Sequence, residues 1–288
     1  MSSTKTLMAI AALSTGMHLA TAEALEAGDF YVQFGYSKIS PHVDSGELKL
    51  SNVPSIRDNP IVGGSLLLTS IRNGNLKGSG VNVKNTDFMG AIVGYMITDK
   101  LSIEIPVAPP PTLEIDSAGT LASQSLAKII NYPVLSGKIG QTDVAPIVVT
   151  AVYHPLPKSW IRPYIGVGAA YTLTYHERIT NRYLMADPVN ESGRPDFEIS
   201  NALSPVGQVG VNIDLWRNLY FNIDIKYIDQ TVDAKVKNIN VDPGAGSGLG
   251  GTLGGVIGQL TGPINIGDAK VKVDVNPWVY SAGLGWRF

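Results

Sequence analysis

The sequence predicts an all-β protein: an eight-stranded antiparallel transmembrane β-barrel with long external loops. The strongest observation is a two-residue period in residues 278–288, which separates large apolar side chains from small or polar ones on opposite strand faces. The apolar face holds Trp278, Tyr280, Ala282, Leu284, Trp286 and Phe288. Such an aromatic strand end is typical of a membrane-interface girdle. An export signal and the spacing of the connections support the same fold.

The N-terminus has the features of a cleaved export signal. Lys5 precedes the apolar run 7–13, and Ala20-Thr21-Ala22 forms a small-x-small cleavage pattern. We therefore predict a signal peptide at 1–22, a barrel domain at 23–288, and localisation in the outer membrane of a Gram-negative bacterium. The alternative is a membrane anchor, but the apolar run is well short of the roughly 20 residues that a spanning helix needs.

Composition limits the remaining classes of protein. After residue 23, no stretch approaches the roughly 18 apolar residues of a transmembrane helix, so a membrane-resident chain must be a closed barrel. The chain is 44% hydrophobic and 16% charged, which suits strands that are apolar on one face only. A formal net charge of -2 gives no basic surface for nucleic acid. The absence of cysteine excludes disulfides and thiolate chemistry.

Eight segments carry the strand pattern in order along the chain. They are 28–39, 87–97, 101–107, 138–153, 164–173, 208–215, 219–227 and about 269–288. The fourth is irregular, because 145–152 is apolar on both faces and contains Pro146. The eighth changes its parity midway, which predicts a bulge near Asn276 and Pro277.

The connections predict the topology. Short turns at 98–100, 154–160 and 216–218 alternate with long segments at about 42–85, 115–137, 176–202 and 237–268. Short periplasmic turns, long external loops and two periplasmic termini are the arrangement of an outer-membrane barrel. A soluble lipocalin-like barrel is the alternative, but it would not need lipid-facing aromatic rows.

Several of these segments resemble the OmpW family of small outer-membrane barrels. The matching pieces are Gly28-Asp29-Phe30, 94–100 (GYMITDK), 161–168 (IRPYIGVG), 207–211 (GQVGV), 273–279 (VDVNPWV) and the final Phe288. The resemblance spans the mature chain, although 42–85 and 237–268 look longer than in other members. It implies a hydrophobic-ligand channel, since the family includes an alkane-uptake protein, and recognition of Phe288 by the barrel assembly machinery.

An eight-stranded barrel has a narrow lumen, filled by side chains or by one small ligand. The predicted inward faces combine glycines with a polar plug made of Glu104, Arg162, Asp214, Asp224, Lys226 and Arg287. These charges could pair across the lumen and only stabilise the barrel, because buried charges need partners. Closer to the outside, Phe88, Ile92, Tyr164 and Pro146 are predicted to line an apolar pocket suited to a hydrophobic solute.

The predicted external loops are unusually apolar. Residues 61–68, 126–130 and 249–260 are rich in leucine, isoleucine and valine. They could pack together as a lid or line a funnel that admits apolar solutes. The family resemblance implies that a solute enters from outside, meets the polar block and leaves sideways through the wall.

Prolines at 146, 205 and 277 remove ladder hydrogen bonds and could open such a wall, or they could simply end strands and seat bulges. The competing function is a sealed barrel that displays its external loops as an adhesin-like, receptor or host-contact surface.

Enzyme and cofactor functions are not predicted. His154 falls in a short turn, and His42 and His176 lack the spacing of a metal site. No G-x-S-x-G nucleophile motif occurs. The glycine-rich run 244–262 lacks the Gly-Lys-Ser/Thr ending of a phosphate loop.

Overall fold

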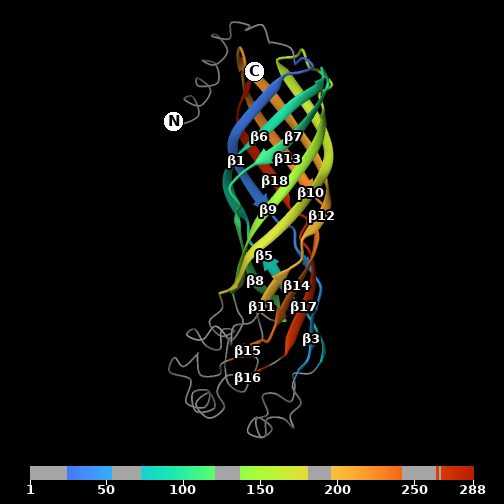
Figure 1. Ribbon diagram of the computed structural model, residues 1–288, viewed down its shortest axis with the longest axis vertical. Helices are drawn as coiled ribbons and strands as arrows, with labels where there is room; N and C mark the ends of the chain where they lie inside the picture. The colour runs from blue at the N-terminus through green and yellow to red at the C-terminus, as the bar shows by residue number, and fades with distance from the viewer. Residues whose placement is uncertain (1–24, 54–72, 121–136, 181–195, 242–263, 266) are drawn as a thin grey trace, which may run out of the picture.

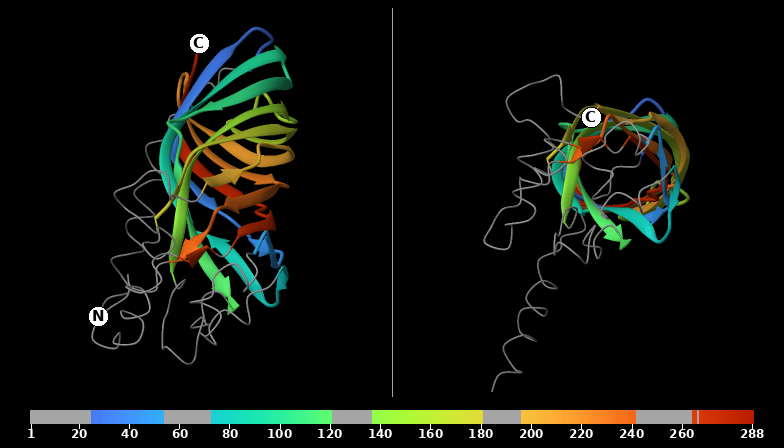
Figure 2. Two further views of the ribbon diagram at one scale, coloured as in Figure 1. Left: turned by 60° about the horizontal axis from the view of Figure 1, so that its bottom comes forward. Right: turned by 90° about the horizontal axis from the view of Figure 1, so that it is seen from below.

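The chain forms a closed antiparallel barrel of eight long strands (Figure 1). This computed structural model describes residues 25–53, 73–120, 137–180, 196–241, 264–265 and 267–288. The barrel strands are β1 (Phe30–Ser40), β6 (Thr86–Thr98), β7 (Leu101–Val107), β9 (Lys138–Tyr153), β10 (Ile161–Ile179), β12 (Ala202–Trp216), β13 (Leu219–Ile228) and β18 (Trp278–Arg287). Each pairs with the next, and β18 pairs back to β1, so the ring seen down the axis is closed (Figure 2).

The side chains alternate between lipid-like and buried surroundings along every barrel strand. On β10 and β12, Val167 is 71% exposed and Leu203 is 74% exposed, whereas the inward Arg162 is 1% exposed. This inversion, with apolar groups outside and charges inside, is expected where the outer surface faces hydrocarbon. No helix in the described part of the chain has the length and apolar character needed to cross a membrane.

Most predicted strands are confirmed, and the eighth is corrected. The fourth strand spans the predicted residues as β9, and the three short turns lie at one end of the barrel with the C-terminus, which we call the turn end (Figure 1). The eighth is two strands in different sheets, β17 (Asp268–Asp274) and β18. Asn276 has a φ of 36° and Pro277 cannot donate, so the chain breaks here and does not continue through a bulge.

The opposite end, which we call the loop end, is built largely of further strands. A six-stranded sheet contains β2 (Asp44–Ser45), β3 (Leu48–Ser51), β4 (Gly74–Leu76), β11 (Asp196–Ile199), β14 (Thr231–Lys237) and β17. β5 (Ser79–Val83) and β8 (Thr112–Gly119) extend the main sheet, and β15 (Asn240–Val241) pairs with β16 (Ile264–Asn265).

The four long segments are thus external connections that contain short paired strands, which the sequence did not predict. The strands of the loop end alternate in the same way as the barrel does: in β17, Val271 and Val273 are buried, whereas Lys270 and Lys272 are exposed. The apolar inner faces need a continuous wall around them, and strand pairing supplies it. The predicted signal peptide and the apolar segments 61–68, 126–130 and 249–260 lie outside the described residues.

Candidate functional site: cavity, wall gap and polar floor

A largely apolar cavity of about 550 Å³ occupies the loop end. Its walls come from both sheets and include Leu48, Leu50, Leu113, Ile115, Val144, Phe197, Ile199, Val232, Ala234, Val236, Val271 and Val273. Polar groups in the lining include Thr142, Thr174 and Gln230, and Lys77 and Lys270 also line the cavity. A cavity of this size with few polar groups is the usual form of a small-molecule site.

The cavity is separated from the rest of the lumen by two layers. Near its base, Thr172 Oγ1 donates a hydrogen bond to Gln230 Oε1 at 3.2 Å. A buried apolar layer follows, made of Val148, Ala170, Val206 and Ile228. These four apolar side chains pack together, so we expect them to hold a molecule on the cavity side of the layer.

The barrel wall is interrupted beside the cavity. β7 pairs with β9 from Leu101↔Tyr153 to Glu104↔Thr150, and β8 resumes the pairing at Thr112↔Asp143. No strand pairing in these fully described segments joins 105–111 to 145–149, and only the hydrogen bond from Val144 N to Pro111 O borders this stretch. We call this interruption the wall gap.

Two prolines explain why pairing stops there. If the β7–β9 register continued, Pro106 would face Val148 and Ala108 would face Pro146. Each pair would need a proline N–H that does not exist, so two successive rungs of the ladder lose a donor. Pro109, Pro110 and Pro111 follow and prevent the register from recovering before β8.

The lumen near the middle of the barrel holds a connected set of polar side chains. Gln208 Nε2 donates to Glu104 Oε2 and Asp224 Oδ2, both at 2.7 Å. Tyr31 and Tyr164 donate through their hydroxyls to Glu104 at 2.8 Å and Asp224 at 2.9 Å. Lys226 forms an ion pair with Asp224. These buried charges are thus neutralised or hydrogen-bonded, which is the condition for keeping them in a low-dielectric interior.

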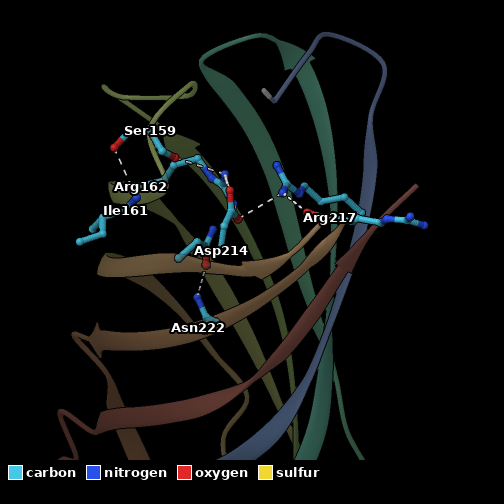
Figure 3. A network of polar contacts seen from close by, with 8 residues as sticks. Ser159, Ile161, Arg162, Asp214, Arg217 and Asn222 are labelled. Atoms are coloured by element: carbon cyan, nitrogen blue, oxygen red, sulfur yellow. Dashed lines mark hydrogen bonds and ion pairs between the residues drawn. The ribbon is translucent and has the colours of Figure 1, made fainter. Parts of the chain in front are cut away.

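A second charged group lies near the turn end. Arg162 forms a two-pronged ion pair with Asp214, and the side chains point toward each other inside the barrel (Figure 3). Arg287 Nη2 also donates to Asp214 Oδ1 at 3.1 Å and to the carbonyl of Arg217 at 3.1 Å. All three ionised side chains are under 10% exposed. We call the mid-lumen group and this group together the polar floor.

Three buried tyrosines pack directly on glycines of neighbouring strands. A Cβ added to Gly94 would lie 2.0 Å from the ring of Tyr31, and one added to Gly285 would lie 2.1 Å from the ring of Tyr220. Tyr164 lies against Gly210 in the same way, at 2.4 Å. The glycines therefore provide the space that the rings occupy inside the narrow lumen.

Charges on the outside of the loop end form a clasp between Lys84, which follows β5, and the strands β8 and β9. Lys138 Nζ lies 2.6 Å from Glu114 Oε1, and Lys84 Nζ lies 3.0 Å from Glu114 Oε2. The hydrogen bond from Lys138, and then that from Lys84, lowers the pKa of the Glu114 carboxyl below the usual glutamate range.

The structure places the residues of the predicted polar plug inside the lumen, all buried: Glu104, Arg162, Asp214, Asp224, Lys226 and Arg287. Of the predicted pocket, Ile92 pairs with Pro106 beside the wall gap, Phe88 lies nearby on β6, and Pro146 lies on the edge of the gap. Tyr164 belongs to the polar floor. None of the four lines the cavity.

Two of the three predicted wall prolines lie away from the gap. Pro205 is paired with Ala169 in an unbroken register, and Pro277 separates β17 from β18.

Sequence reasoning missed two features of the polar floor. His154 was assigned to a turn, but it is fully buried and its Nε2 lies 3.1 Å from Ser102 Oγ. Tyr31 also belongs to this cluster. The available signal was that Tyr31 and Gln33 lie on the same face of β1, opposite the face that meets lipid. In the part of the chain that the structure describes, no three His, Cys, Asp or Glu side chains gather as a metal site would require.

Comparison with known proteins is consistent with this geometry. The model of the OmpW family matches residues 26–247. The dibenzothiophene metabolism operon protein PahQ of Pseudomonas aeruginosa is 26% identical over 76% of this chain and 77% of its own length. Outer membrane protein W of Escherichia coli is 25% identical over 98% of this chain and 99% of its own length. OprG from Pseudomonas aeruginosa is 21% identical in sequence. Its crystal structure superposes with a TM-score of 0.64 over 93% of this chain and 99% of the OprG chain.

Proposed function

Because this chain belongs to the OmpW family of outer-membrane proteins, we propose that it takes up small hydrophobic molecules passively and releases them sideways into the membrane. The observation that carries the proposal is the adjacency of the cavity and the wall gap. Val144 lines the cavity, and the unpaired stretch of β9 begins at the next residue. A relative named for dibenzothiophene metabolism supports an apolar cargo.

The proposed route follows from what is open and what is closed. A solute in the cavity meets the layer of Val148, Ala170, Val206 and Ile228, and beyond it the polar floor. Passing straight through would require breaking buried ion pairs, which costs several kcal/mol. The wall gap offers an exit with exposed Ile105, Val107, Ile147 and Val149 around it. Apolar cargo therefore leaves toward lipid.

Restoring the missing donors tests the exit. In Pro106→Ala/Pro146→Ala, both rungs of the β7–β9 ladder regain an N–H, and we expect uptake of dibenzothiophene to fall to that of cells lacking the protein. Pro163→Ala/Pro205→Ala is the matched control, because both prolines lie in continuous registers. Uptake is measured in a deletion strain at equal amounts of folded barrel. Undiminished uptake by the first variant would count against lateral release.

Filling the cavity tests the entrance. Ala234→Phe places a ring in the cavity, whereas Lys235→Phe places the same ring on the outer face of β14. We expect the first variant to lose dibenzothiophene uptake and the second to retain it. Equal uptake by both would remove the cavity from the route.

A sealed display barrel is the second candidate function, and the closed polar floor favours it. In that case deletion of the protein would leave uptake of dibenzothiophene unchanged while reducing attachment to a surface or host cell. In either case we propose that Phe288, which is 71% exposed at the turn end, is the residue that the barrel assembly machinery recognises.

A further inference from the structure

The edges of the wall gap carry backbone groups that the ladder does not use. Val144 N donates toward β8 and His154 N toward Lys100 O, so even-numbered residues of β9 direct their backbone groups to this side. The groups facing the gap are therefore the N–H and C=O of Val148 and Ala108 and the carbonyls of Pro106 and Pro146. This is a set of two donors and four acceptors in a lipid-facing wall.

Such groups have a consequence for the molecule that passes them. In hydrocarbon an unsatisfied backbone group is costly, and a bare alkane chain covers these groups without bonding any of them. A hydroxyl group can donate to a carbonyl and accept from an N–H, so it satisfies both kinds of group. A carboxylate meets mainly carbonyl dipoles of the same sign as its own charge.

The side chains that border the gap favour the same chemistry. Thr150 lies in the last pair before the gap, is fully buried, and its Oγ1 has no hydrogen-bond partner. Glu104, its cross-strand neighbour, and Asp143, at the other end of the gap, are both acidic. Asp143 accepts from Thr112 and lies 3.2 Å from His176. An unpartnered hydroxyl opposite a carboxyl group suits a neutral polar group and not an anion.

The cavity itself also offers hydrogen-bonding groups to a hydroxyl. Its polar lining includes the hydroxyls of Thr142 and Thr174 and the amide of Gln230, which can bond a hydroxyl group. Lys77 and Lys270 also border the cavity, but both residues are exposed, and Lys270 Nζ lies 3.5 Å from Asp233 Oδ2. Discrimination against anions is therefore assigned to the gap and not to the cavity.

We propose that the wall gap is a selectivity site for neutral apolar molecules that carry one hydroxyl group, in preference to hydrocarbons or carboxylates of equal chain length. This inference rests on the proposed lateral release. The hydroxyl group of the transported molecule forms hydrogen bonds with the backbone groups that the ladder leaves unpaired. Its apolar chain meanwhile moves past Ile147 and Val149 into lipid. Thr150 Oγ1, at the border of the gap toward the polar floor, is the side-chain partner that we assign to this hydroxyl.

Three probes of one chain length test the proposal: dodecane, 1-dodecanol and dodecanoate. Initial uptake rates in cells with the protein are divided by the rates in the deletion strain. We expect the acceleration of 1-dodecanol to exceed that of dodecane about two- to tenfold, the span of one net hydrogen bond. Dodecanoate should be accelerated least.

A variant pair locates the site. Thr150→Val keeps the side-chain volume and should reduce the preference for 1-dodecanol without changing dodecane uptake. Ser204→Ala removes an equally buried and unpartnered hydroxyl two strands away and should leave the preference unchanged. Equal acceleration of dodecane and 1-dodecanol, or the largest acceleration for dodecanoate, would overturn this inference alone. Acceleration of no probe would instead overturn the proposed function.

Discussion

The two halves of this barrel share one outer surface and have opposite interiors. Toward the turn end, the lumen is filled by charges and tyrosines that bond one another, as in the pair of Arg162 with Asp214. Toward the loop end, valines of β14 and β17 surround an open cavity. The same strand alternation thus produces a sealed or a hollow cylinder, depending on whether the inward side chains can reach partners across the lumen.

The largest effect should come from breaking the sealed half. Asp214→Ala leaves Arg162 and Arg287 buried without their shared carboxylate, so we expect a loss of about 3–5 kcal/mol in the free energy of unfolding. Urea titration of the purified barrel in detergent measures it. In contrast, replacing the exposed Asp233 of the loop end should change little, because surface pairs contribute at most about 1 kcal/mol. A loss below 1 kcal/mol for Asp214→Ala would refute the distinction between the halves.

A smaller effect should come from the tyrosine–glycine contacts. Gly94→Ala forces Tyr31 from its place above the strand, and overpacking of this kind costs about 1–3 kcal/mol. Gly207→Ala is the control, because an added Cβ there meets no atom within 4 Å. Urea unfolding should separate the two variants. If Gly94→Ala unfolds like Gly207→Ala, the ring does not fill the space that we assign to it.

The smallest effect should come from the charged clasp of the loop end. The pKa of Glu114 is lowered when folded, so its contribution to stability is fully present above the usual glutamate pKa of about 4.3 and is lost as the pH falls through the folded value. The melting temperatures of the wild type and Glu114→Gln should therefore differ by a constant amount from pH 7 to about pH 4.5 and converge below it. A difference that grows on acidification would contradict the assignment.

The sequence was sufficient to predict the barrel because two solvents impose a strict period of two. Val167 and Gly166, or Leu284 and Gly285, differ so much in character that the strand and its lipid-facing side are predicted together. The same argument placed all six charges of the plug in the lumen. It worked wherever a strand was apolar on one face only.

The loop end was harder to predict for a physical reason. Its strands are short, and β14 presents the ordinary alternation of a soluble strand, so nothing distinguishes it from a polar loop without its partners. The residues of β17 were predicted as the start of the eighth barrel strand, although they pair in the other sheet. The place of the wall gap could not be predicted for a similar reason. Pro146 was named together with Pro205 and Pro277, but its effect depends on Pro106, which would face the same edge only in the register of β7 with β9.

The closure of the ring by its first and last strands constrains how the protein is made. β1 pairs with β18 over ten residue pairs, and Phe288 N bonds to Phe30 O at 2.8 Å. Until the final strand arrives, β1 exposes an unpaired edge, which is a template for aggregation. The N-terminal strands therefore cannot form a closed barrel before the last strand has been made. Any truncation that removes the last ten residues should therefore leave β1 without its partner and produce an insoluble product and not a smaller barrel.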